Sequence, residues 1–223
     1  MRIVRTFGLA LIAAAIIPAV VSAQNAKPAQ RDFNDSWYWG LKGGSTMFTA
    51  GADGNTKVNA PTFGAEWLIT RTTMALNISV DQSFFDDKSG VYDPTVAGSI
   101  RPVSISDMRR YQASVLFFPK RFGSLRPYAG IGFALNVIQN ANPEGTYLSA
   151  ESQTAILKSV NDQSSRASAA FTVGAQLQVQ RAAIFAQGVT MPTRNNFLLN
   201  GSANTFMIEA GIRYNLVAAI EKF

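Results

Sequence analysis

The residues that most often carry chemistry in proteins are scarce in this sequence. None of its 223 residues is cysteine or histidine, which excludes a disulfide scaffold and a zinc–thiolate site and removes the commonest catalytic base. A serine with a lysine is an alternative nucleophile and base, and Lys42 and Ser45 lie near each other in one predicted strand. Three residues apart on a strand, their side chains point to opposite faces. We therefore expect no catalytic residue, no cofactor and no metal site, and a protein that is not an enzyme.

Two short acidic segments are candidates for cation binding, Asp53-Gly54-Asn55 and Asp86-Asp87-Lys88-Ser89-Gly90. Neither has the oxygen spacing of an EF-hand calcium loop, so we interpret both as solvated loops. The formal net charge of +6 is not gathered into a long basic run. We therefore expect no nucleic-acid partner.

Composition and length favour one folded unit. Hydrophobic residues make up 47% of the sequence and charged residues 15%, which is too little charge for a disordered chain. The length suits one domain or one closed barrel.

Residues 1–23 have the pattern of a cleaved secretory signal peptide. Arg2 and Arg5 precede an apolar run from Phe7 to Val21, and Val21-Ser22-Ala23 fits a cleavage site. The apolar run is shorter than the roughly 20 residues of a transmembrane helix, so an uncleaved anchor is the weaker alternative. Residues 24–35 are polar and aperiodic, and we interpret them as a flexible periplasmic leader. The predicted remainder is a folded domain at 36–217 and a short tail at 218–223.

The folded part alternates between apolar and polar residues with a period of two, which predicts β-strands. Eight such segments occur, each about as long as a tilted membrane strand. The seventh alternates poorly and is placed by its spacing. The predicted strands run from Trp37 to Phe48, Pro61 to Ile69, Thr73 to Phe84, Ile105 to Phe118, Pro127 to Ile138, Arg166 to Gln180, Ala183 to Met191 and Thr205 to Leu216.

This pattern fits either a soluble sandwich with its apolar face inside or a membrane barrel with its apolar face outside. The connections alternate in length, which is typical of membrane barrels with short periplasmic turns and longer outer loops. The short connections are Thr70-Arg71-Thr72, Lys120 to Arg126, and Arg181-Ala182. The longer connections are Ala50 to Ala60, Phe85 to Ser104, Gln139 to Ser165, and Pro192 to Asn204.

Aromatic and charged residues favour the membrane barrel. Aromatic side chains at the strand ends near the short connections indicate an interfacial girdle; they are Trp37, Trp39, Trp67, Phe117, Tyr128 and Tyr214. The faces opposite the apolar ones carry six charges, which a soluble core would hardly bury; they are Lys42, Glu66, Asp81, Arg110, Glu209 and Arg213. We therefore predict an all-β fold, an eight-stranded antiparallel up-and-down transmembrane β-barrel.

The six charges suggest how the lumen is filled. An eight-stranded barrel is just wide enough for side chains to fill it, and closure places the last strand beside the first. We expect Lys42 and Arg213 to pair with Glu66 and Glu209. Asp81 and Arg110, on neighbouring strands, are expected to form a second pair. The interpretation is a structural charge network, with a gated ion path as the alternative.

These features together resemble the small outer-membrane β-barrel family, of the OmpA, OmpX and opacity-protein kind. The segment from Glu209 to Leu216 resembles the β-signal that the outer-membrane assembly machinery reads, a polar residue, a glycine and two apolar residues at fixed spacing. The matching positions are Glu209, Gly211, Tyr214 and Leu216. The resemblance implies location in the outer membrane of a diderm bacterium. The partners that it implies are outer-membrane lipid, lipopolysaccharide and the assembly machinery.

The function expected from the sequence is a non-enzymatic outer-membrane barrel. It would support envelope structure or surface interaction through its long outer loops, with a surface ligand that the residues do not name. The alternative is a narrow pore or a small-ligand carrier, a soluble lipocalin-like barrel being less favoured. In the largest outer loop, Ile156, Leu157 and Val160 lie at helical spacing and Ser149 is a suitable cap. This spacing predicts a short helix over 149–162.

Overall fold

The computed structural model describes residues 33–51, 55–193, 197–199, 201 and 203–218. In these residues, eight antiparallel strands pair in sequence order, and pairing of the last strand with the first closes a barrel. The predicted fold class is therefore confirmed. The strands are β1 (Ser36–Ala50), β2 (Thr56–Thr70), β3 (Met74–Tyr92), β4 (Ile100–Phe117), β5 (Leu125–Pro143), β6 (Ser165–Val179), β7 (Ala182–Pro192) and β8 (Asn204–Ala218).

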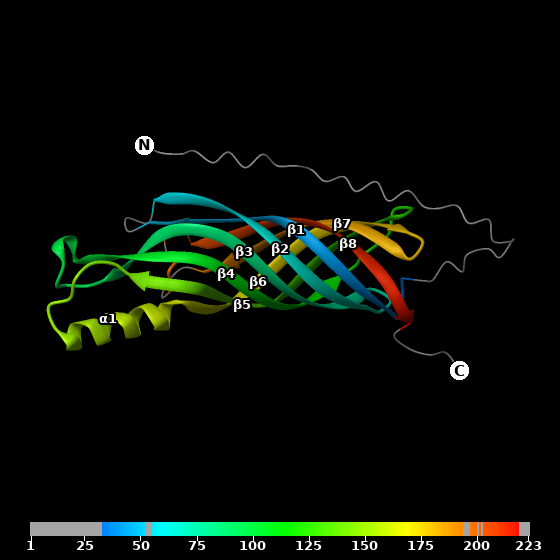
Figure 1. The fold of residues 1–223 in the computed structure, drawn as a ribbon. Helices are drawn as coiled ribbons and strands as arrows, with labels where there is room; N and C mark the ends of the chain where they lie inside the picture. Colours follow the sequence, from blue (N-terminus) through cyan, green and yellow to red (C-terminus); the bar gives the residue numbers. More distant parts are fainter. Residues whose placement is uncertain (1–32, 52–54, 194–196, 200, 202, 219–223) are drawn as a thin grey trace, which may run out of the picture.

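Two helical elements lie in the connections. A short 3-10 helix, η1 (Ala97–Ser99), precedes β4, and α1 (Ala150–Gln163) joins β5 to β6. The helix α1 lies at the same end of the barrel as the β3–β4 hairpin, whereas the described chain enters β1 and leaves β8 at the opposite end (Figure 1). We call these the outer end and the inner end. Among the described residues, no helix combines the length and the hydropathy needed to cross a membrane.

The alternation of each strand separates an apolar outside from a filled inside. Leu41, Phe63, Phe133 and Ile208 are exposed on the outward face, whereas all six predicted lumen charges are buried. Because successive strand residues point to opposite faces, a period of two in the sequence becomes an inside and an outside. An apolar exterior around a charged interior is the reverse of a soluble sandwich and matches a membrane barrel.

The segment Phe85 to Ser104, predicted as a loop, is mostly strand. β3 and β4 continue pairing from Asp86 and Ser106 to Tyr92 and Ile100, beyond a register shift between Ser83 and Asp86. This extension lacks the simple alternation of the membrane-spanning part, so the sequence pattern did not reveal it. β5 accompanies β4 as far as Pro143. The three strands therefore project past the rest of the barrel at its outer end (Figure 1).

Candidate functional site: the lumen charge network and the outer end

Four of the six predicted charges meet near the middle of the lumen. The Lys42 ammonium lies 2.9 Å from an Asp81 carboxylate oxygen and 3.1 Å from a Glu209 oxygen. The Arg110 guanidinium lies 2.7 Å from Asp81 and 2.9 Å from Glu209. Two cations and two carboxylates therefore alternate around one ring of contacts, contributed by β1, β3, β4 and β8. All four side chains are at most 1% exposed.

The other two charges form a separate pair closer to the inner end. Arg213 on β8 donates to Glu66 on β2 and, at 2.7 Å, to the side-chain oxygen of Gln176. Its guanidinium carbon also lies 3.8 Å from the centre of the Phe185 ring. Planar stacking and directed hydrogen bonds together fix the orientation of a buried arginine.

The grouping of the charges differs from the sequence expectation in one respect. Lys42 contacts Glu209 and Asp81 contacts Arg110, each on adjacent strands, and Arg213 contacts Glu66 across the intervening strand β1, as expected from the sequence. Asp81 and Arg110 do not stand apart, however, because both also contact the Lys42–Glu209 pair. The lumen of an eight-stranded barrel is narrow enough for side chains from opposite walls to meet.

The structure does not bring Lys42 and Ser45 together. The Lys42 ammonium donates to Glu209 at 3.1 Å and to the hydroxyl oxygen of Ser79 at 3.3 Å, and it forms an ion pair with Asp81. Its partners are therefore the groups of the lumen network. Ser45 is not among its partners in the structure.

Apolar layers close the lumen on both sides of the charges. The inner apolar layer contains Phe33, Tyr38, Leu68, Ala75, Leu116, Phe118 and Tyr128. The outer apolar layer contains Phe48, Ala50, Val58, Ala60, Val91, Val103, Ile105, Met108, Ile138, Ile156, Val160, Phe197, Leu198 and Leu199. Along β1 the order from the inner end is Tyr38, Lys42 and Phe48, which places the charges between two apolar seals.

The outer layer includes a loop segment that the sequence analysis missed. Phe197, Leu198 and Leu199, from the connection between β7 and β8, are at most 1% exposed. The Leu198 backbone N–H donates to the Gln163 carbonyl at 3.0 Å, and the Leu198 carbonyl accepts a bond from Ser89. The apolar run Phe-Leu-Leu in the sequence indicates burial, but it is too short to show whether the segment forms a strand or a loop packed over the end of the barrel.

The predicted helix in the largest loop is confirmed. The Ser149 hydroxyl accepts a hydrogen bond of 3.1 Å from the Ser152 N–H, and α1 begins at Ala150. Ile156 and Val160 are buried in the outer layer, whereas Leu157 is exposed. The helix therefore packs one narrow face onto the mouth of the barrel and leaves its other side open.

The projecting hairpin is fixed by a buried ion pair near its tip. The Arg101 guanidinium donates to Asp93 at 2.6 Å and to the Glu144 carbonyl at 2.7 Å, and it lies 4.4 Å from the centre of the Tyr147 ring. Hydrogen bonds from Thr95 and from Arg101 hold the pKa of Asp93 below its usual range. These contacts join the β3–β4 hairpin to the segment that follows β5.

Five of the six predicted girdle aromatics lie on the outward side near the inner end. Trp67 contacts both Trp37 and Trp39, with ring centres 5.3 Å and 5.7 Å apart. Phe117 and Tyr214 are also outward and about half exposed. This is the arrangement of an interfacial aromatic belt.

The prediction that Tyr128 belongs to the girdle is wrong. Its side chain is 2% exposed, and its hydroxyl lies 2.9 Å from the Gln187 side-chain oxygen in the lumen. The physical reason is strand parity. Tyr128 shares the inward face of β5 with Ala134 and Asn136, which are also buried.

Each residue of the predicted β-signal has a defined place on β8. Glu209 lies in the charge network, while Tyr214 and Leu216 face outward. A methyl group added at Gly211 would overlap the Leu41 carbonyl of the paired strand β1 and would lie only 2.8 Å from the Phe185 ring. Glycine is therefore required at this point, where β8 closes against β1.

The last residues of the predicted leader pack against the inner end of the barrel. Phe33 is buried in the inner apolar layer, Arg126 lies 4.3 Å above its ring, and Asp35 forms a 2.8 Å ion pair with Arg71. The flexibility of the leader stays a prediction. The signal peptide at 1–23, the leader at 24–32 and the tail at 219–223 lie outside the described residues. β8 extends one residue past the predicted boundary, to Ala218.

Comparison with solved structures identifies the fold. Neisserial surface protein A matches with a TM-score of 0.53 and 9% identity, covering 81% of this chain and 97% of its own. This chain has the fold of the small eight-stranded outer-membrane β-barrels. Weaker matches are Ail of Yersinia pestis (TM-score 0.43, 13% identity, 82% of this chain and 99% of that one) and the outer membrane protein OprG of Pseudomonas aeruginosa (0.44, 9%, 82% and 94%). No protein-family model and no curated protein matches the sequence.

Proposed function

We propose that this barrel resides in the outer membrane of a diderm bacterium, after export and cleavage of residues 1–23, as a non-enzymatic surface-interaction protein. The apolar outward face and the aromatic belt support insertion into a bilayer. Lipid, lipopolysaccharide and the outer-membrane assembly machinery are its proposed envelope partners. The long outer connections then face the outside of the cell.

The projecting β3–β4–β5 sheet carries the proposal. On the outward face, Phe84 is exposed and its ring centre lies 6.4 Å from that of Phe63, so the apolar band of β3 reaches at least to Phe84. β3 continues from Phe84 to Tyr92, which corresponds to about 26 Å of strand at roughly 3.3 Å per residue. This length would hold the tip of the hairpin well clear of the bilayer surface.

The tip offers apolar contact area. Tyr92 and Ile100 pair directly across the hairpin, and both are exposed, Tyr92 at 72%. Exposed aromatic and aliphatic residues on a rigid element are typical anchors of protein interfaces. The buried Arg101–Asp93 pair beneath them keeps this surface in one conformation.

The lumen argues against the alternative of an open pore. The described side chains fill it in three layers, and the charges of the middle layer are paired with one another rather than aligned along a path. Conduction would require movement of both apolar layers. A planar-bilayer recording of the purified barrel tests this, and stable conductance steps would favour the pore.

Adhesion of cells that express the protein tests the surface role. In the double variant Tyr92→Ser/Ile100→Ser we expect attachment to epithelial monolayers to fall about fivefold or more, because interface anchors contribute roughly 1 kcal/mol or more each. The matched control is Leu157→Ser, which changes an exposed apolar residue at the same end but outside the tip. Surface amounts and the gel-mobility shift on boiling should be equal in all variants. Unchanged attachment of the tip variant would refute the proposal.

A further inference from the structure

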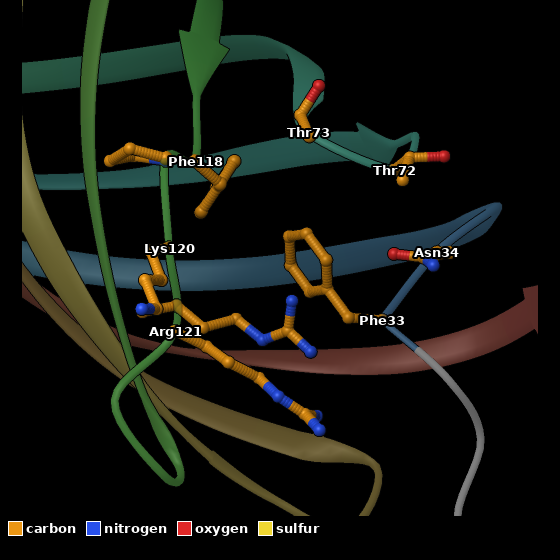
Figure 2. A pocket seen from close by; sticks show the side chains of 9 residues that line it. Phe33, Asn34, Thr72, Thr73, Phe118, Lys120 and Arg121 are labelled. Atoms are coloured by element: carbon orange, nitrogen blue, oxygen red, sulfur yellow. The ribbon is translucent and has the colours of Figure 1, made fainter.

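A polar pocket opens at the inner end of the barrel, on the side opposite the projecting hairpin. Its volume is about 340 Å³, at the lower end of the range for small-molecule sites. Figure 2 shows Phe33 between the β4–β5 turn, which carries Lys120 and Arg121, and the β2–β3 turn, which carries Thr72 and Thr73. The pocket is therefore built by three segments that are far apart in the sequence.

The charges that line this pocket are all positive. Lys120, Arg121 and Arg126 line it, together with Thr72 and Thr73, and no acidic residue among those that the structure describes does. No carboxylate of the described residues forms an ion pair with Lys120 or Arg121. Three cations around one hollow form a donor set suited to a phosphate group.

The ring of Phe33 gives the pocket a fixed wall. It is 2% exposed and packs edge-on against Phe118, with ring centres 4.8 Å apart. Arg126 stacks over the same ring at 4.3 Å. A guanidinium held on an aromatic face loses less freedom when it binds an anion.

The surroundings indicate a lipid as the source of that phosphate. The turn that carries Lys120 and Arg121 also exposes Phe122 and Leu125, whose backbones pair with each other. Phe117, an outward girdle residue, lies directly before the buried Phe118. A membrane–water interface favours apolar side chains that lie next to cations, and here both lie at the level of the aromatic belt.

We propose that this pocket binds the phosphate of an anionic phospholipid headgroup from the leaflet on the inner side of the membrane. Lys120 and Arg121 supply charge from the turn, and Arg126 supplies a guanidinium that is oriented by the ring of Phe33. The site would anchor the inner rim of the barrel to the leaflet. The proposal rests on the membrane placement proposed above, which recovery of the protein in the outer-membrane fraction tests separately.

Native mass spectrometry of the full barrel in detergent, with phosphatidylglycerol or phosphatidylcholine added, tests the site. We expect preferential retention of phosphatidylglycerol. Arg121→Gln should weaken its binding about fivefold, and Lys120→Gln/Arg121→Gln about 25-fold, if each cation near an anionic surface contributes about a factor of five. The matched control is Arg181→Gln, which removes a cation from the β6–β7 turn at the same end but outside the pocket. We expect less than a twofold change there.

Three results would overturn the proposal. Equal losses in Arg121→Gln and Arg181→Gln would indicate general attraction to a basic rim instead of a site. Equal retention of the two lipids would show no selection for anionic headgroups. Binding of inorganic phosphate as tight as that of phosphatidylglycerol, in a ³¹P NMR titration, would point to a free anion as the ligand. A loss of the gel shift on boiling would instead count against the barrel fold of that variant.

Discussion

Neutralising Glu209 should destabilise the barrel more than removing any exposed charge. The four-residue ring of the lumen contains two cations, Lys42 and Arg110, and two carboxylates, Asp81 and Glu209. Glu209→Gln keeps the shape and leaves two cations with one carboxylate in a site without access to water. An uncompensated buried charge costs about 3–5 kcal/mol, so we expect a loss of that size in the free energy of unfolding.

Two further variants separate charge imbalance from other effects. Glu144→Gln breaks the 2.7 Å ion pair between Lys88 and Glu144, whose side chains are 60% and 37% exposed, respectively. Such a surface pair contributes only about 0–1 kcal/mol to stability. Lys42→Met together with Glu209→Gln restores neutrality, because Arg110 keeps Asp81. The double variant should therefore be more stable than the sum of the single losses predicts, by about 2 kcal/mol.

Equilibrium unfolding in urea, with the barrel in lipid vesicles, measures these free energies. The fluorescence of Trp37, Trp39 and Trp67 reports on the transfer of the aromatic belt out of the interface. A loss below about 1 kcal/mol for Glu209→Gln, similar to that of Glu144→Gln, would show that water screens the network. Additive losses in the double variant would show that Lys42 and Glu209 do not interact.

Other perturbations give separate tests. Gly211→Ala should lower the free energy of unfolding by about 1–3 kcal/mol because of overpacking, and it should slow the appearance of the folded band on gels. Gly188→Ala is the control and should be tolerated, because its added methyl would lie 3.9 Å from the nearest atom. Because the pKa of Asp93 is lowered from its ordinary value of 3.8, its ion pair with Arg101 stabilises the hairpin tip above that pH and is lost as the pH falls through the lower, folded-state pKa. Hydrogen exchange of the tip amides should therefore rise only in strong acid, and Asp93→Asn should remove this dependence. Ser149→Ala should weaken the start of α1 by about 1 kcal/mol, measured as faster exchange at its first amides.

Strand parity is what made most of the fold predictable from the sequence. Because a strand turns its side chains alternately to two faces, the inward position of Glu66, Asp81 and Arg213 follows from their apolar neighbours. The same rule, applied consistently, places Tyr128 inside. The sequence prediction assigned Tyr128 to the aromatic belt because Tyr128 is aromatic and lies near the end of its strand. Strand parity was the stronger constraint.

The features that escaped prediction depend on contacts between distant segments. Phe33 is buried only because the β4–β5 turn and Arg126 meet it at the inner end. Phe197 to Leu199 are buried only because α1 and β3 lie beneath them. The outer half of the β3–β4 hairpin pairs through its backbone, which leaves little trace in side-chain type.

The position of β8 in the charge network has a consequence for how the barrel forms. Lys42, Asp81 and Arg110 belong to the first half of the chain, whereas Glu209 lies 167 residues beyond Lys42. Glu66 likewise pairs with a residue of the last strand, Arg213, which lies 147 residues later in the chain. A sheet of seven strands therefore holds an excess cation and an unmatched carboxylate, and both need hydration. We therefore expect water to leave the interior when the last strand pairs with the first, so that dehydration of the lumen and closure of the barrel are coupled.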